Sequence, residues 1–182
     1  PATQPFNLTS GWNSISFYIE PEVGTDVLVL FADLISSGSL VEIKSYNSGE
    51  SYNPNLPSFL NSLSTIDITH AYSINVTEDV SFQVDGILVD LPVERSFNSG
   101  WNYIAYPMDT PGNACFILSS LLDNGKLLSA CPGTYIEGTD PAYNYEPGEN
   151  LVDHCYSIFP GDDDNGNEDY CDDSINFLPG QG

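Results

Sequence analysis

Three blocks of residues recur in the same order along the chain, and this repetition limits the folds that the sequence can adopt. The paired blocks are SGWNSISFYIEP (10–21) with SGWNYIAYPMDT (99–110), DVLVLFADLISSGSLVEI (26–43) with ACFILSSLLDNGKLLSAC (114–131), and HAYSI (70–74) with HCYSI (154–158). Repeated blocks in one order are typical of units that fold alike. We therefore predict two tandem copies of one small module, residues 1–97 and residues 98–182.

The spacing of apolar residues predicts that each copy is α+β and mostly β. Alternation in the first block puts four side chains on or near a buried strand, namely Trp12, Ile15, Phe17 and Ile19. The second block predicts a short amphipathic helix that ends at Ser37-Gly38 and a strand over SLVEIKSY. A glycine-bearing turn follows at 47–49, and a weak second helix is expected near 57–63.

Strands are also expected at the HAYSI block and in VSFQVDGILVDLPV, which predicts a hairpin that turns at Asp85-Gly86. Small modules of this kind form partly closed barrels or sandwiches with short helices. In the second copy the acidic stretch FPGDDDNGNEDYCDD stands where the first copy has this hairpin. The acidic stretch is therefore expected to replace ordinary structure of the module.

The chain carries 26 acidic residues against three basic ones, Lys44, Arg95 and Lys126, which gives a formal net charge of -23. This charge repels nucleic acids and anionic lipid surfaces, so no nucleic-acid partner is expected. Like charges also destabilise a compact chain unless salt screens them or divalent cations neutralise them locally. We therefore expect a saline or calcium-rich extracellular or cell-surface location.

The four cysteines, Cys115, Cys131, Cys155 and Cys171, all lie in the C-terminal half, as in a secreted chain with two disulfides. Of the three possible pairings we favour Cys115 with Cys131 and Cys155 with Cys171, since each closes a loop of about 15 residues that contributes about 3 kcal/mol in the chain-entropy model; the other two pairings stay open. No apolar run reaches the roughly 20 residues that span a bilayer, so no membrane insertion is expected.

The acidic stretch from Gly161 to Asp173 is a candidate calcium site. Calcium binds six to eight hard oxygen ligands, which closely spaced Asp and Asn side chains supply on a turn that contains glycine. The candidate ligands are Asp162, Asp163, Asp164, Asn165, Asn167, Asp169 and Asp172. The alternative is a solvated acidic loop, but carboxylates crowded beside Cys171 repel one another unless a cation binds.

Two resemblances follow from these residues. Gly-Trp-Asn followed by Ile-x-Phe/Tyr, a helix and a closing x-x-Tyr-x-Ile strand resembles a repeat module of secreted and cell-surface proteins, notably of marine Bacteroidetes. That resemblance implies an extracellular, non-catalytic building block, although the usual Gly before the closing Tyr is Ala71 or Cys155 here. With Gly166 at the loop glycine, the acidic stretch resembles the calcium loops of EF-hands and thrombospondin type 3 repeats, except that Gly161 stands at the first position.

No residue pattern indicates an enzyme. His70 and His154 occupy equivalent places in a repeated strand, which favours a structural role, and each serine three residues later points to the opposite face. No nucleophile elbow, phosphate loop or zinc signature is present. The chemistry predicted from the chain is therefore binding and assembly.

Tyrosines and glycosylation sequences mark further candidate surfaces. Tyr135, Tyr143 and Tyr145 lie in one polar segment that could bind a glycan or a protein partner. Asn7 and Asn75 begin sequons for N-glycosylation, and Ser174 lies in an Asp-Ser-Ile sequence that resembles the O-glycosylation motif of Bacteroidetes. Intact mass would reveal either modification.

These features together predict a non-enzymatic extracellular structural protein, a self-assembling subunit of a surface filament, appendage or coat that calcium stabilises. Its partners would be copies of itself or other surface proteins. The alternative is a carbohydrate-binding or adhesion module of a larger secreted protein. A pure scaffold should bind no glycan specifically, so glycan binding separates the two.

Overall fold

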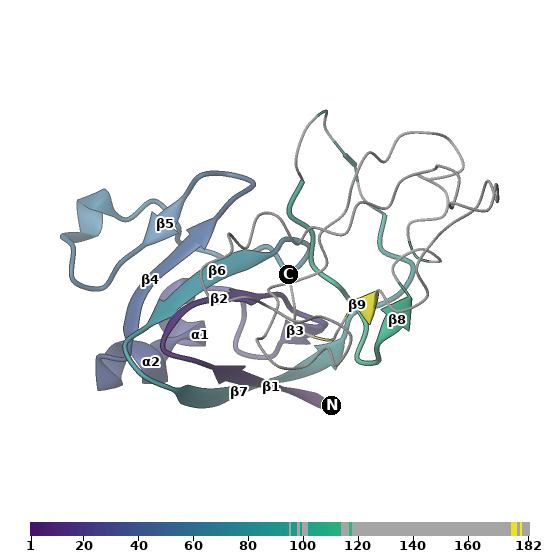
Figure 1. Ribbon diagram of the computed structural model, residues 1–182, viewed down its shortest axis with the longest axis horizontal. Helices are drawn as coiled ribbons and strands as arrows, with labels where there is room; N and C mark the ends of the chain where they lie inside the picture. Colours follow the sequence, from purple (N-terminus) through teal and green to yellow (C-terminus); the bar gives the residue numbers. More distant parts are fainter. Residues whose placement is uncertain are drawn as a thin grey trace, which may run out of the picture. The chain divides into compact units, whose positions relative to one another are not determined.

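Two sheets and two short helices make up the N-terminal part of the chain (Figure 1). The computed structural model describes residues 1–94, 96–97, 99, 102–113, 117, 176–177 and 179. It divides into one unit of Pro1–Thr110 with Pro179–Gly182 and a second unit of Pro111–Leu178. In the second unit, the described residues include two short antiparallel strands, β8 (Gly112–Asn113) and β9 (Asn176–Phe177).

The first unit contains two antiparallel sheets. Sheet A has the order β1-β7-β3, with β1 at Ala2–Leu8, β7 at Val80–Leu88 and β3 at Ile19–Pro21. Sheet B has the order β2-β6-β4-β5, with β2 at Gly11–Ile15, β6 at Tyr72–Val76, β4 at Leu40–Ser45 and β5 at Ser51–Tyr52. The prediction of a mostly β fold is confirmed, but the two sheets do not close into a barrel.

One apolar core lies between the sheets and the helices. Strand alternation supplies it, since β1 buries every second side chain from Gln4 to Leu8, and β6 buries Tyr72, Ile74 and Val76. The ring of Phe6 stacks on Phe82 with centroids 4.7 Å apart. Each fully buried apolar side chain contributes roughly 1.5–3 kcal/mol, so this core is the main source of stability.

A buried amide fixes the place where the chain passes from sheet B to sheet A. Gln4 in β1 is fully buried, and its Nε2 donates to the Ser16 carbonyl at 2.8 Å. Its Oε1 accepts from the Tyr18 backbone N–H at 3.0 Å. Residues 16–18 join β2 to β3, so one side chain satisfies backbone groups that neither ladder can reach.

The helical block predicted from the sequence forms two short helices, α1 (Val27–Leu30) and α2 (Ala32–Ser37). The Asp26 carboxylate caps α1 by accepting from the N–H groups of Leu28 and Val29 at 2.8 and 3.3 Å. Gly38 ends α2 at φ 75°, a left-handed conformation that glycine adopts without strain. The predicted helix end at Gly38, the strand β4 and the turn that ends at Gly49 (φ 73°) are confirmed.

The predicted hairpin at Asp85-Gly86 is wrong. Strand β7 runs without a break from Val80 to Leu88, and Gly86 pairs with Ala2 on one side and Pro21 on the other. A Cβ at Gly86 would lie 2.1 Å from the Glu20 carbonyl oxygen. The glycine therefore permits a close approach between strands, and it does not mark a turn.

Two smaller predictions also differ from the structure. The second helix expected near 57–63 is a single 3-10 turn, η1 (Ser58–Leu60), because the backbone becomes extended at Asn61 and the next two N–H groups donate to the Ser51 carbonyl. Trp12 does not lie in the core and is 48% exposed, because in β2 it points to the outer face of sheet B. Ile15, Phe17 and Ile19 are buried as predicted.

The first unit of the structure extends to Thr110, past the predicted module boundary at 97–98. Residues 102–110, which fall in the predicted second module, belong to the first unit of the structure. The module boundary at 97–98 and the repeat interpretation itself stay predictions. Among the described residues, no helix has the length and the apolar character needed to cross a membrane.

Substituting Gly86 tests the close approach of β7 to β3. Gly86→Ala should lower the free energy of unfolding by about 2–3 kcal/mol, because backbone atoms must shift to admit the methyl group. Urea unfolding followed by tryptophan fluorescence measures the change. Gly24→Ala is the control, since Gly24 has φ 83° but open space around it and should cost only about 1 kcal/mol. Equal losses at the two sites would contradict the packing argument.

Candidate interaction surfaces

Most of the site residues predicted from the sequence lie outside the described residues. These are the four cysteines, the calcium ligands from Asp162 to Asp172, the tyrosines Tyr135, Tyr143 and Tyr145, and Ser174. Within the described part of the chain, no group of three or more His, Cys, Asp or Glu side chains is placed to hold a metal ion. The calcium and disulfide predictions therefore stay predictions.

Both asparagine sequons lie in the part of the chain that the structure describes, and the two asparagines differ in accessibility. Asn7 is exposed in β1, at an edge of sheet A, and its Oδ1 accepts from the Ser81 hydroxyl at 2.8 Å. Asn75 is half-buried in β6, the second strand of sheet B, where it pairs with Trp12 and Glu42. Asn7 is thus the more open of the two acceptors.

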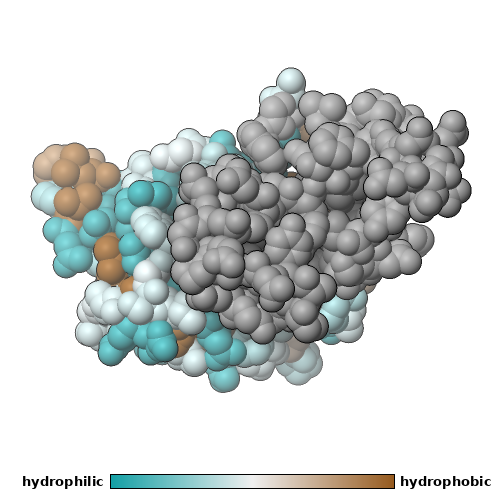
Figure 2. Space-filling view, viewed as in Figure 1, coloured by the Kyte–Doolittle hydropathy of each residue, from teal (hydrophilic) through white to brown (hydrophobic). Residues whose placement is uncertain are grey.

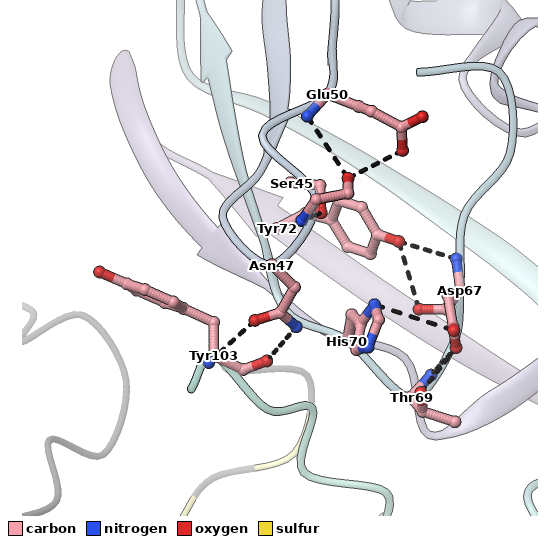
Figure 3. Close-up of polar contacts among 9 residues, drawn as sticks. Ser45, Asn47, Glu50, Asp67, Thr69, His70, Tyr72 and Tyr103 are labelled. Atoms are coloured by element: carbon pink, nitrogen blue, oxygen red, sulfur yellow. Dashed lines mark hydrogen bonds and ion pairs between the residues drawn. The ribbon is translucent and has the colours of Figure 1, made fainter. Parts of the chain in front are cut away.

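The turn before β6 is organised by Asp67 (Figure 3). Its carboxylate accepts from the backbone N–H and the hydroxyl of Thr69 at 2.8 and 2.7 Å, and it lies 3.8 Å from His70 Nδ1. The Tyr72 hydroxyl accepts from the Asp67 backbone N–H at 2.7 Å, and burial raises the pKa of this phenol above its usual value. These contacts hold the turn that carries His70.

Residues 102–106, called here the docked segment, lie along this turn. His70 forms an antiparallel bridge with Ile104, and the Ala105 N–H donates to the Thr69 carbonyl at 3.2 Å. Asn47 holds both backbone groups of Tyr103, since its Nδ2 donates to the carbonyl at 2.6 Å and its Oδ1 accepts from the N–H at 3.1 Å (Figure 3). The docked segment thus binds mainly through its backbone.

Side chains of the docked segment add packing. The ring of Tyr103 stacks on Tyr46 with centroids 4.5 Å apart, while Ala105 and Tyr106 are buried. The Tyr106 N–H donates to the Ser16 hydroxyl at 3.3 Å, and the Tyr106 hydroxyl donates to the Thr110 carbonyl at 2.8 Å. The docked segment therefore lies on a surface formed by residues 46–47, Ser16 and 69–70, and this surface is called here the groove.

A loop after β5 forms a second surface, which we call the apolar tip: Leu56, Phe59 and Leu60. Their exposed fractions are 45%, 83% and 54%. Figure 2 shows a brown cluster at the upper left, where the loop after β5 lies in Figure 1. Exposed apolar side chains gathered in one loop are typical of interaction sites.

Backbone hydrogen bonds hold the apolar tip in one conformation. The Asn61 side chain accepts from the Asn53 N–H at 2.9 Å and donates to the Asn53 carbonyl at 3.1 Å, which closes the base of the loop. The Asn55 N–H donates to the Asn53 side chain at 2.9 Å, and the N–H groups of Leu56 and Leu60 donate to Asn53 and Pro57 carbonyls. A preformed apolar surface loses little conformational entropy on binding.

The outer face of sheet B is a third surface. Lys44 Nζ lies 4.7 Å from the centre of the Trp12 ring and 3.1 Å from a carboxylate oxygen of Glu42. Asn75 pairs in register with Trp12 and Glu42, and Ser73 pairs with Lys44. Lys44 and Glu42 cancel in charge, so these residues form a neutral face with one exposed indole.

The sequence analysis did not predict the apolar tip or the role of Asn47, and only the apolar tip has a pattern in the sequence that could have indicated it. Residues 51–66 contain no charged side chain, and the same is true of residues 1–19. The uncharged stretch at 51–66, together with Leu56 before Pro57 and the apolar pair Phe59-Leu60 after it, could have indicated the apolar tip. The role of Asn47 depends on residues 56 positions away, and no local pattern indicates it.

Comparison with known proteins finds no protein family, no curated protein and no solved structure that matches this chain.

Proposed function

We propose that the protein is a non-enzymatic extracellular structural subunit that assembles with copies of itself and that calcium stabilises. The observation that carries this proposal is the apolar tip, a preformed surface whose central residue, Phe59, is 83% exposed. An apolar side chain in water gains free energy when another surface covers it. A second copy of the chain is the occupant that we propose.

Charge favours the apolar tip as the point of contact between copies. Two chains that each carry -23 repel one another, and the repulsion is weakest where no carboxylate lies. The sixteen residues 51–66 carry no charge, and they contain the apolar tip. By contrast, the exposed side chains around α1 (Val23, Leu28 and Val29) lie beside Glu22 and Asp26, so approach there needs more screening.

Removing the central aromatic side chain tests this assembly. Wild-type protein at about 0.15 M salt with about 5 mM calcium should form oligomers or filaments that mass photometry and electron microscopy detect. Phe59→Ser should weaken association by at least about tenfold, because the largest exposed apolar surface is lost.

Ile87→Ser is the matched control for this experiment. Ile87 is 67% exposed but lies in β7 of sheet A, so its substitution should leave the association constant unchanged. A wild-type protein that stays monomeric from low salt to about 1 M salt, with and without calcium, would contradict the proposed function.

Calcium is proposed to bind the acidic stretch from Asp162 to Asp172. Chelation at low salt should lower the thermal unfolding midpoint by roughly 5–10 °C, since a ligand at 100 times its Kd stabilises a fold by about 2.7 kcal/mol. Asp163→Asn with Asp169→Asn should remove this response, as measured by calorimetry with and without chelator. Asp90→Asn with Glu94→Gln changes the charge equally at exposed sites of the first unit and should keep the response.

A second function, glycan binding, is favoured by the outer face of sheet B. An exposed indole stacks on the apolar face of a pyranose ring, and the nearby amide and hydroxyl groups of Asn75 and Ser73 can bond to sugar hydroxyls. Because Lys44 and Glu42 cancel and the whole chain repels anions, a neutral saccharide is the ligand class that fits.

Glycan-array binding followed by calorimetry tests the second function. A neutral saccharide that binds the wild-type protein should bind Trp12→Ala at least about tenfold more weakly, because the stacking surface is lost. Phe59→Ala, which removes an exposed aromatic ring from the apolar tip, should bind as wild type does. An array without specific ligands, or equal binding by Trp12→Ala, would exclude this role for the sheet.

A further inference from the structure

The apolar tip is too small to hold two copies together by itself. Three side chains that are only partly exposed bury at most roughly 400–500 Å². A stable protein interface buries about 800 Å² on each partner. If copies of the chain assemble, a further contact must supply the remaining area.

The groove that holds the docked segment already has an occupant of known chemistry. It binds an extended stretch, Asn102 to Tyr106, through the Asn47 amide, the carbonyl of Thr69 and the hydroxyl of Ser16. The Tyr46 ring and a buried site for Ala105 complete it. These contacts specify an extended peptide with a small residue between two larger ones, the pattern Tyr-Ile-Ala-Tyr.

The connection to the docked segment is long enough to reach another copy. Strand β7 ends at Leu88 and the docked segment begins at Asn102, a difference of 14 residues. An extended chain of that length spans at most about 45–50 Å. A unit of this size has a radius of gyration near 13 Å, so the same connection can reach the groove of an adjacent unit.

We infer that the groove takes residues 102–106 from a neighbouring copy of the chain, and that assembly proceeds by exchange of this segment. The inference rests on the proposed self-assembly and names its contact. Exchange forms the same hydrogen bonds and the same tyrosine stack between chains that the structure shows within one chain, so it requires no new complementarity.

Concentration decides between the two arrangements. A connection of this length holds the docked segment near its own groove at an effective concentration in the millimolar range. Dilute chains therefore keep the segment in their own groove. Where apolar tips bring copies together, the local concentration of neighbouring grooves becomes comparable, and exchange links the chains in a head-to-tail series.

Two complementary variants test the exchange. The groove variant, Tyr46→Ala with Asn47→Ala, loses the ring stack and both bonds to Tyr103 but keeps a normal segment. The segment variant, Ala105→Asp, places a carboxylate where a buried methyl group sits, but keeps a normal groove. Neither variant can exchange with its own copies. When the two variants are mixed, the normal segment of the groove variant can bind the normal groove of the segment variant. A 1:1 heterodimer should then form.

Native mass spectrometry with one variant labelled by a heavy isotope detects the heterodimer. Asn13→Ala is the control for the groove variant, since the Asn13 side chain also bonds to the backbone, twice to Thr9 and once to Gly11, and makes no contact with the docked segment. It should assemble as wild type does. A peptide with the sequence of residues 102–110 gives a second measurement, because it should bind the segment variant at least tenfold more tightly than the groove variant.

Each result decides the inference. A heterodimer from variants that do not assemble alone supports exchange. If the wild-type protein assembles and either variant assembles equally well, or if the mixture stays monomeric and the peptide binds neither chain, the exchange is overturned while the proposed assembly stands. If the wild-type protein does not assemble, the proposed assembly fails, and the absence of a heterodimer at millimolar concentration overturns the exchange as well.

Discussion

The buried amide of Gln4 supports both the fold and the groove. Its two hydrogen bonds fix residues 16–18 where the chain leaves sheet B for sheet A. An unpaired buried backbone group costs about 1–3 kcal/mol, so this crossing depends on the side chain that satisfies it. Ser16, whose carbonyl Gln4 holds, presents its hydroxyl to the N–H of Tyr106. The same amide that joins the sheets therefore positions one wall of the groove.

Local chemistry decided which parts of the fold could be predicted from the sequence. The helix end at Gly38 and the alternation of buried and half-buried side chains in β6 both depend on residues that are close in the sequence. Both predictions were confirmed. The prediction of a hairpin at Asp85-Gly86 was wrong because an Asp-Gly pair is typical of a hairpin turn but is also compatible with a close approach to a neighbouring strand. The neighbour, Glu20, lies 66 residues earlier in the chain, so no local pattern separates the two meanings.

The candidate surfaces were harder to predict because they depend on exposure, which is a property of the folded chain. Trp12 lies three residues before Ile15, so the two side chains point to opposite faces of β2, and Trp12 lies on the outer face of sheet B. The sequence partly indicated the apolar tip, because residues 51–66 carry no charge. A surface without carboxylates can approach another anionic chain with less repulsion. The sequence did not indicate the groove, since Asn47 and Tyr103 meet only after folding.

In the assembly that we propose, charge and segment exchange control different steps. Repulsion between two chains at -23 is long-ranged and falls with salt, so it mainly controls whether copies meet. Backbone hydrogen bonds and a buried alanine act at contact distance and control how long the copies stay together. In the proposed exchange, a segment must leave the groove of the other copy before the two chains separate. The apolar tip would then set how often copies meet, and the groove would set the rate at which they dissociate.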